Sequence, residues 1–182
     1  MNKEQLEPLR FPNGRFTAPE KYTEEVLAKA AKTIKDFPQE IRALVKDIKE
    51  EALIWKYRPG GWNIRQVVHH CADSHMNAFI RFKLALTEDN PTIKPYKQGF
   101  WAELGDSKDY PLEPSLLIMD GLHPRFSALL ESMKEEDYKK TFHHPDWDKS
   151  LPLEMNACLY AWHCKHHLGH IKNAIASNGS YS

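Results

Sequence analysis

Residues 151–177 have the sequence LPLEMNACLYAWHCKHHLGHIKNAIAS, and their pattern predicts one long amphipathic helix. A helix advances about 100° per residue, which places the apolar side chains on a single stripe: Leu153, Ala157, Tyr160, Cys164, Leu168, Ile171 and Ile175. We expect the helix to begin near Leu151 or Pro152 and to end before Asn178-Gly179, residues typical of a helix C-terminus. Other elements must cover such a stripe, so this helix is expected to belong to a larger helical core.

Three further segments show the same helical spacing of apolar residues: 19–53, 63–88 and 113–133. Pro38 is expected to kink or break the first of them, because proline lacks the N–H that a helix interior needs. The second has the clearest start in the chain, since Asn63 is a good N-cap and Gln66 can complete a capping box. Pro124 could bend the third. The chain therefore contains four candidate helices.

The remaining segments predict connections rather than further core elements. Residues 90–111 contain three prolines and no convincing periodicity, so a long crossover loop is expected between the second and third helices. Residues 1–17 hold two prolines and a glycine and are expected to form an irregular N-terminal arm. With almost no strand signal, the sequence predicts an all-α fold, a bundle that forms a single domain over residues 1–182.

Composition excludes several classes of partner. Lys+Arg and Asp+Glu both number 25 in 182 residues, and the balanced charge predicts binding neither to nucleic acid nor to an anionic membrane surface. No apolar run approaches the roughly 18 residues needed to span a bilayer, and the first residues lack the apolar segment of a secretory signal. Three cysteines, Cys71, Cys158 and Cys164, are an odd number inside predicted helices, which favours reduced thiols and a cytoplasmic protein.

Histidines form the most informative polar pattern. The last helix has two pairs at i,i+4 spacing, His163 with His167 and His166 with His170, so spacing alone does not choose between them. Relative to the apolar stripe, the first pair points into the bundle and the second toward solvent. With His70 taken as the inward histidine of the second helix, three imidazoles can meet at one point. Three nitrogen ligands with open coordination positions are typical of a catalytic metal site.

Polar residues near His70 have two interpretations. Its neighbours on the same helix face form a polar stripe: Gln66, Asp73, Ser74, Asn77 and Arg81. This stripe is either a solvated helix face or the lining of a polar pocket. In the second interpretation, Asp73 is a candidate to fix the tautomer of a ligand imidazole, or to act as a base for bound water.

Three segments, taken together, resemble a known family. They are PGGWNIRQVVHHCADSHMNAFIRFKLALTEDNPTIKPY (Pro59 to Tyr96), FWAEL (Phe100 to Leu104) and YAWHCKHHLGHI (Tyr160 to Ile171). In this order they resemble the YfiT-like branch of the DinB superfamily, whose members are usually described as metal-dependent hydrolases. The resemblance implies a four-helix bundle, a long crossover after its second helix, and a homodimer. It also implies one divalent transition metal per chain, zinc or nickel, with His70, His163 and His167 as ligands.

The first functional hypothesis is therefore a metal-dependent hydrolase of a small-molecule substrate. Three neutral imidazoles leave the charge of the metal intact, so bound water would be acidified to a pKa near ~7. The ligands would be His70, His163 and His167, and Asp73 or Asn77 would position water or substrate as catalytic residues.

Two other functions remain open. The wider superfamily includes thiol-dependent transferases, so the second hypothesis is an S-transferase using a thiol of the bacillithiol or glutathione type. Arg81, Lys94 and Lys97 would then be candidates to bind the carboxylates of that thiol. The third is a non-catalytic metal-binding bundle, for which Cys164 is a candidate fourth ligand, although it lies about 100° round the helix from His163.

Other expectations concern the surroundings of this site. Trp101, in the connector, is either a packing residue or a lid over the metal pocket, and the pair His143 and His144 is expected to lie in a solvent-exposed loop. The ligand assignment predicts that alanine at any of the three ligand histidines abolishes stoichiometric metal binding. Alanine at His166 or His170 is expected to leave it intact.

Overall fold

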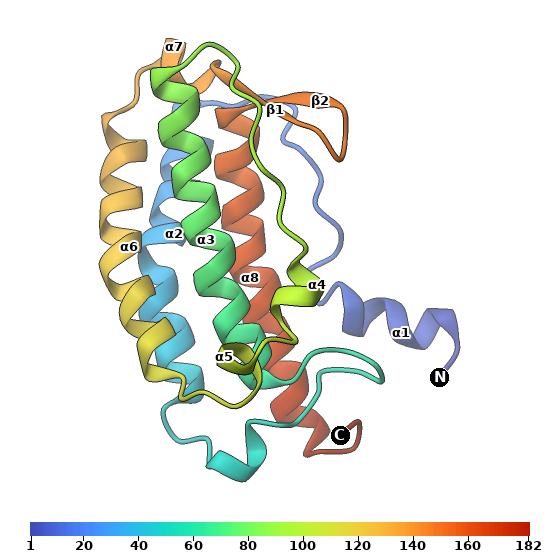
Figure 1. Cartoon of the computed structure of the whole chain (residues 1–182). Coiled ribbons are helices and arrows are strands. Elements are labelled where there is room, and N and C mark those ends of the chain that lie inside the picture. The colour runs from blue at the N-terminus through green and yellow to red at the C-terminus, as the bar shows by residue number, and fades with distance from the viewer.

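A computed structural model describes all 182 residues, and its long helices form a four-helix bundle (Figure 1). They are α2 (Glu24–Val45), α3 (Ile64–Thr87), α6 (Glu113–Ser132) and α8 (Leu153–Ser177). Helices α2 and α3 each pack against both α6 and α8, so these two consecutive helices lie on opposite corners of the bundle. The predicted all-α bundle, with its long crossover between α3 and α6, is confirmed.

Local sequence signals explain where the two site-bearing helices begin and end. At the start of α3 the Asn63 side chain accepts a hydrogen bond from the Gln66 N–H at 2.8 Å, and the Gln66 side chain accepts one from the Asn63 N–H at 3.1 Å. This is the predicted capping box. At the other end of the chain, α8 stops at Asn178, whose φ of 47° is the left-handed conformation that commonly terminates helices.

Helix α2 differs from the expectation at Pro38. The proline lies inside one continuous helix, which ends at Val45, and only a short 3-10 turn, η1 (Glu50–Ala52), follows where a longer helix was expected. Because proline has no N–H, the carbonyl of Ile34 loses the donor that would normally reach it from four residues ahead. Packing of the apolar face of α2 against α6 and α8 holds the helix together despite this missing bond.

The N-terminal arm also differs from the expectation of an irregular segment. Residues 3–10 form α1 (Lys3–Arg10), which starts with its own capping box. The following residues dock on the outer face of α8, where the indole N–H of Trp162 donates to the Gly14 carbonyl at 3.1 Å. The arm approaches α8 so closely at Gly169 that a Cβ there would lie 2.5 Å from Pro12 Cγ. The arm is therefore part of the packed structure.

The crossover carries two short helices, α4 (Gln98–Trp101) and α5 (Gly105–Lys108), and α5 packs against α3 (Figure 1). It is tied to the start of α3 because the buried amide of Gln66 donates to the Ala102 carbonyl at 2.8 Å. Of the polar stripe of α3, Gln66 and Ser74 are buried and the other members are half-buried, so the stripe is not an openly solvated helix face.

A small hairpin replaces the loop expected before α8. After α7 (Glu135–Tyr138), strands β1 (Thr141–His144) and β2 (Lys149–Pro152) pair in antiparallel register. The expectation that both hairpin histidines are solvent-exposed is wrong: His143 is half-buried, and His144 is only 6% exposed because its ring stacks on Trp147 at a centroid distance of 4.3 Å.

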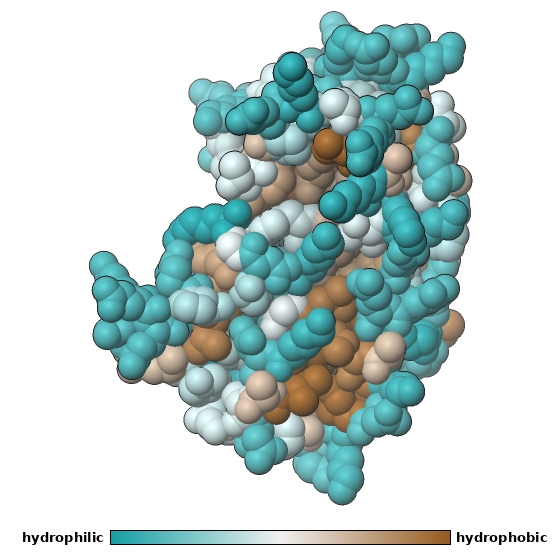
Figure 2. Space-filling view, turned by 180° about the vertical axis from the view of Figure 1, so that it is seen from behind, coloured by the Kyte–Doolittle hydropathy of each residue, from teal (hydrophilic) through white to brown (hydrophobic).

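One continuous hydrophobic core fills the bundle, and its largest fully buried side chains include Phe37, Phe82, Phe126 and Met119. All three cysteines are buried free thiols, as expected for a reduced protein. On the face opposite to that of Figure 1, hydrophobic residues gather in the lower half among hydrophilic ones (Figure 2). No helix in the structure combines the length and apolar character needed to cross a membrane.

Candidate metal centre

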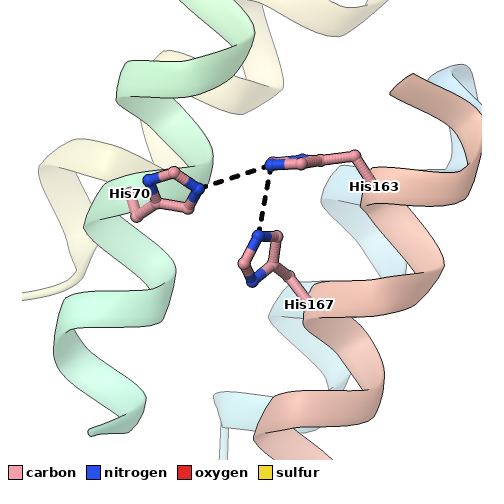
Figure 3. Close-up of side chains that lie close together, drawn as sticks. All are labelled: His70, His163 and His167. Carbon is pink, nitrogen blue, oxygen red and sulfur yellow. Dashed lines mark hydrogen bonds between the residues drawn. The ribbon is translucent and has the colours of Figure 1, made fainter. Parts of the chain in front are cut away.

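Three imidazoles from α3 and α8 converge on one point (Figure 3). The Nε2 atom of His163 lies 3.3 Å from Nε2 of His70 and 3.1 Å from Nε2 of His167. Two nitrogens bound to one zinc at about 2.1 Å with a tetrahedral angle would be about 3.4 Å apart. The structure therefore brings together the three histidines that the sequence singled out: two of the three nitrogen pairs have about this spacing, and all three donor atoms lie within 4.8 Å of one another.

Burial keeps these imidazoles in the form that binds metals. Desolvation lowers the pKa of His70 to about 3, and it lowers the pKa values of His163 and His167 well below their ordinary value, with further lowering from neighbouring histidines. The three rings are therefore neutral at neutral pH. A neutral imidazole offers a nitrogen lone pair, so no proton has to be removed before a metal binds.

The other pair on α8 is not directed toward solvent. His166 and His170 are only 9% and 3% exposed, because α1 and the residues after it cover this side of α8. The ring of His170 stacks on Tyr57 at 3.8 Å, and the ring of His166 stacks on Trp162 at 4.4 Å. The predicted choice between the two pairs holds, since only His163 and His167 of α8 join the three-histidine cluster. The reason given for that choice, solvent exposure of the second pair, is wrong.

A cavity of about 440 Å³ opens onto the three histidines. Its other side chains come from α1, the segment before α3, the crossover and α8: Arg10, Phe11, Tyr57, Arg58, Trp62, Gln98, Trp162, His166 and His170. No carboxylate lines it, and neither Arg10 nor Arg58 forms an ion pair, so the cavity has a positive potential. The Nε atom of Arg58 is buried without a hydrogen-bond partner.

Asp73 and Asn77 lie apart from this cavity. The Asn77 amide donates to the main-chain carbonyl of Asp73 at 2.9 Å, and neither side chain hydrogen-bonds to the three imidazoles. Desolvation under the crossover, with a smaller contribution from Asp106, raises the pKa of Asp73 to about 6. A catalytic role for these two residues stays a prediction that no contact with the cluster supports.

Other candidates are also separate from the histidine cavity. Trp101 is 38% exposed and packs on Tyr96, and the crossover residue that reaches the cavity is Gln98. Lys94 and Lys97 line a different cavity of about 430 Å³, and Arg81 lines neither. The cations available to a bound anion are therefore Arg10 and Arg58, which the sequence pattern did not single out.

Cys164 is unsuited to complete the metal site as a fourth ligand. It is fully buried in the core and lies outside the three-histidine cluster. Burial raises the pKa of this thiol well above its ordinary value, and burial raises that of Cys71 as well. Both are therefore protonated packing residues, which leaves the cluster open on its cavity side.

Comparison with known proteins identifies the family to which the chain belongs. Residues 33–171, which include all three converging histidines, match the family model of the DinB superfamily. The chain belongs to the DinB superfamily. The match begins within α2 and ends within α8, so the DinB region contains most of the four-helix core.

Individual DinB relatives are similar over nearly the whole chain. A Bacillus cereus protein named as a "putative metal-dependent hydrolase" is 51% identical over 166 residues, covering 91% of this chain and 95% of that protein. A Bacillus anthracis protein with the same description is 50% identical over the same length, with the same coverage of both chains.

A solved DinB structure confirms the topology. YfiT from Bacillus subtilis, described as a probable metal-dependent hydrolase with an unusual four-helix bundle topology, superposes with a TM-score of 0.91. It is 40% identical in sequence, and the superposition covers 94% of this chain and 98% of YfiT. The resemblance inferred from the three sequence segments is confirmed.

Proposed function

We propose that this protein is a metal-dependent hydrolase that binds one divalent ion, zinc or alternatively nickel, through Nε2 of His70, His163 and His167. One observation carries the proposal: three neutral imidazoles present their Nε2 atoms to one point at the base of an open cavity. Imidazole is a ligand that suits both of these metals. The names of the relatives, which describe metal-dependent hydrolases, support the same conclusion.

The residues around the ligands define what the site can do. When bound, a divalent ion supplies Lewis acidity at its open positions, which acidifies water or polarises an electrophile. Three neutral ligands do not cancel the charge of the ion, and the Trp62 ring, 4.7 Å from that of His70, shields the ligand from bulk water. The size of the cavity is in the range of small-molecule sites.

The charge of the cavity favours one class of substrate. Arg10 and Arg58 lie at its wall without carboxylate partners, and guanidinium groups bind carboxylates and phosphates through paired hydrogen bonds. The substrate we propose is a small molecule that carries a carboxylate or phosphate near the bond to be cleaved.

One feature favours a second function, that of a thiol S-transferase. Since no carboxylate lines the cavity, no acidic side chain is placed there to take a proton from water. A coordinated thiol loses its proton outright and needs no such base. The two arginines would then bind the carboxylates of a low-molecular-weight thiol.

The test is turnover and metal content of untagged protein loaded with zinc or with nickel. Small esters bearing a carboxylate are assayed with and without added thiol, in the wild type, in His163→Ala and in His143→Ala, a control from the hairpin. We expect one metal per chain and thiol-independent turnover in the wild type and the control, and neither in His163→Ala. Turnover only with thiol would establish the transferase instead, and bound metal without turnover would leave a non-catalytic metal-binding bundle.

A further inference from the structure

The nitrogen of His163 that points away from the proposed metal begins a chain of imidazoles through the core. Its Nδ1 lies 2.9 Å from Nε2 of His75, and Nδ1 of His75 lies 2.8 Å from Nε2 of His123. Nδ1 of His123 lies 2.6 Å from the main-chain oxygen of Ile34. The chain takes one member from each of the helices α8, α3, α6 and α2, and it crosses the whole bundle.

The carbonyl at the end determines every proton position in this chain. A carbonyl oxygen only accepts, so His123 must carry its proton on Nδ1 and donate it to Ile34. A neutral imidazole has one N–H, so Nε2 of His123 accepts from Nδ1–H of His75. Nε2 of His75 then accepts from Nδ1–H of His163. His163 is left with a lone pair on Nε2, the atom that faces the other two proposed ligands.

Pro38 makes the end of the chain available. Inside a helix, the Ile34 carbonyl would accept from the N–H four residues ahead, but Pro38 occupies that position and has no N–H. His123 and His75 are 0% and 1% exposed, so water does not compete for these bonds. The proline that was expected to disturb α2 thus frees a buried acceptor for His123.

His167, the second proposed ligand on α8, also begins a chain of hydrogen bonds, and this chain ends at a different main-chain carbonyl. Nδ1 of His167 lies 3.3 Å from Nδ1 of His170, and Nε2 of His170 lies 3.1 Å from the carbonyl oxygen of Arg10. Arg10 is the last residue of α1, where helix carbonyls lack partners from their own helix. The carbonyl places the proton of His170 on Nε2, so Nδ1 of His170 accepts from Nδ1–H of His167 and leaves Nε2 of His167 unprotonated.

We propose that His75, His123 and His170 are positioning residues that hold His163 and His167 in the tautomer with a free Nε2 lone pair, ready to bind metal. The inference rests on the proposed metal site and explains how it is prepared. Without the chains, either ring can carry its proton on Nε2, and that tautomer cannot bind a metal through the converging atom. Ligand histidines commonly donate their second N–H to a carbonyl or carboxylate, and here buried imidazoles extend that contact to two distant carbonyls.

The first readout is the tautomer of His163 in the full-length, metal-free protein. Long-range ¹H–¹⁵N correlation spectra of histidine side chains distinguish a proton on Nδ1 from one on Nε2. We expect Nδ1–H for His163, His75 and His123 in the wild type, and a mixture of tautomers for His163 and His75 in His123→Leu. Nε2–H for His163 in the wild type would overturn the inference. This measurement needs no metal, so it stands even if the proposed function fails.

The second readout is the affinity for zinc alone, measured by competition with a chelator. We expect His123→Leu and His170→Leu still to bind one zinc per chain, but about 10- to 100-fold more weakly than the wild type. Glutamine carries a donor and an acceptor on one planar group, so His123→Gln is expected to recover much of the loss. His69→Leu is the matched control, because His69 is also buried on α3 but bonds only to Ser115 and to the Tyr110 carbonyl.

These variants separate the inference from the proposed function. Wild-type zinc affinity in folded His123→Leu and His170→Leu would overturn the inference and leave the metal site intact. If His123→Leu does not fold, the inference is tested by the tautomers of the wild type and by the zinc affinity of His170→Leu. If the wild type bound neither zinc nor nickel, the proposed function itself would be contradicted.

Discussion

Docking of the N-terminal arm on α8 can be tested at one glycine. A Cβ at position 169 would lie 2.5 Å from Cγ and 2.7 Å from Cβ of Pro12, closer than real side chains approach. Replacing Gly169 with alanine therefore combines two opposite effects. Alanine is favoured over glycine in a helix interior by about 1 kcal/mol. Overpacking against the proline ring costs about 1–3 kcal/mol, so we expect Gly169→Ala to be neutral to destabilising by about 2 kcal/mol.

Gly121 supplies a matched control because it also lies inside a long helix, α6, but a Cβ there would have no atom within 4 Å. Gly121→Ala is expected to stabilise the protein by about 1 kcal/mol. The difference between the two variants isolates the steric cost of the arm, about 1–3 kcal/mol. Urea unfolding monitored by circular dichroism gives both free energies if the two variants share one m-value.

Two results would refute this reasoning. Equal stabilisation by both substitutions would mean that Pro12 does not lie against Gly169. The N-terminal arm would then not cover His166 and His170 as described. A Gly169→Ala defect that persists after Pro12→Gly would place the clash elsewhere, because that second substitution removes the ring.

The remaining predictions concern pH and the cavity. Burial lowers the pKa of His70 to about 3 and that of His123 to about 4, so the unfolded chain binds more protons than the metal-free folded protein in acid. The free energy of unfolding is therefore highest above the unfolded pKa of about 6.5 and decreases as the pH falls below it, by up to about 1.4 kcal/mol per pH unit for each such histidine. A urea unfolding midpoint that stays constant from pH 7.5 to 5 would contradict this prediction. Arg58→Met is expected to raise KM about tenfold or more for a carboxylate-bearing substrate, with little change in KM for the neutral methyl ester of that substrate. An equal increase in KM for both substrates would exclude recognition of the carboxylate charge by Arg58. Asp73→Asn tests the hypothesis that Asp73 is a base. Because Asp73 does not line the cavity, we expect kcat to be nearly unchanged. A loss of about 100-fold or more in kcat would restore Asp73 as the general base.

Signals that act within one helix were predictable from the sequence. The capping box at Asn63 and Gln66 placed the start of α3, and the apolar stripe of α8 selected His163 and His167. Both signals depend on contacts between residues a few positions apart, which the sequence displays directly. The choice of His70 relied on family resemblance as well, and the convergence of the three Nε2 atoms agrees with it.

Features that arise from tertiary contacts were not predictable in this way. His170 lies on the polar side of its helix and is buried because Tyr57 and the end of α1 cover it, and its contact with Arg10 joins residues 160 positions apart. Pro38 was expected to kink or break its helix, and the role of the carbonyl that it frees depends on His123 of another helix. His75 follows His70 by five residues, a spacing that does not place two side chains on the same face of a helix. The proposed role of His75 depends on its partners, His123 of α6 and His163 of α8.

The measurement that tests the central claim most directly is anomalous diffraction from crystals of the protein loaded with zinc, recorded at the zinc absorption edge. We expect one strong peak per chain at about 2.1 Å from Nε2 of His70, His163 and His167, on the side of the cluster that faces the cavity. The absence of a peak at these three nitrogens, or a peak held by other side chains, would contradict it.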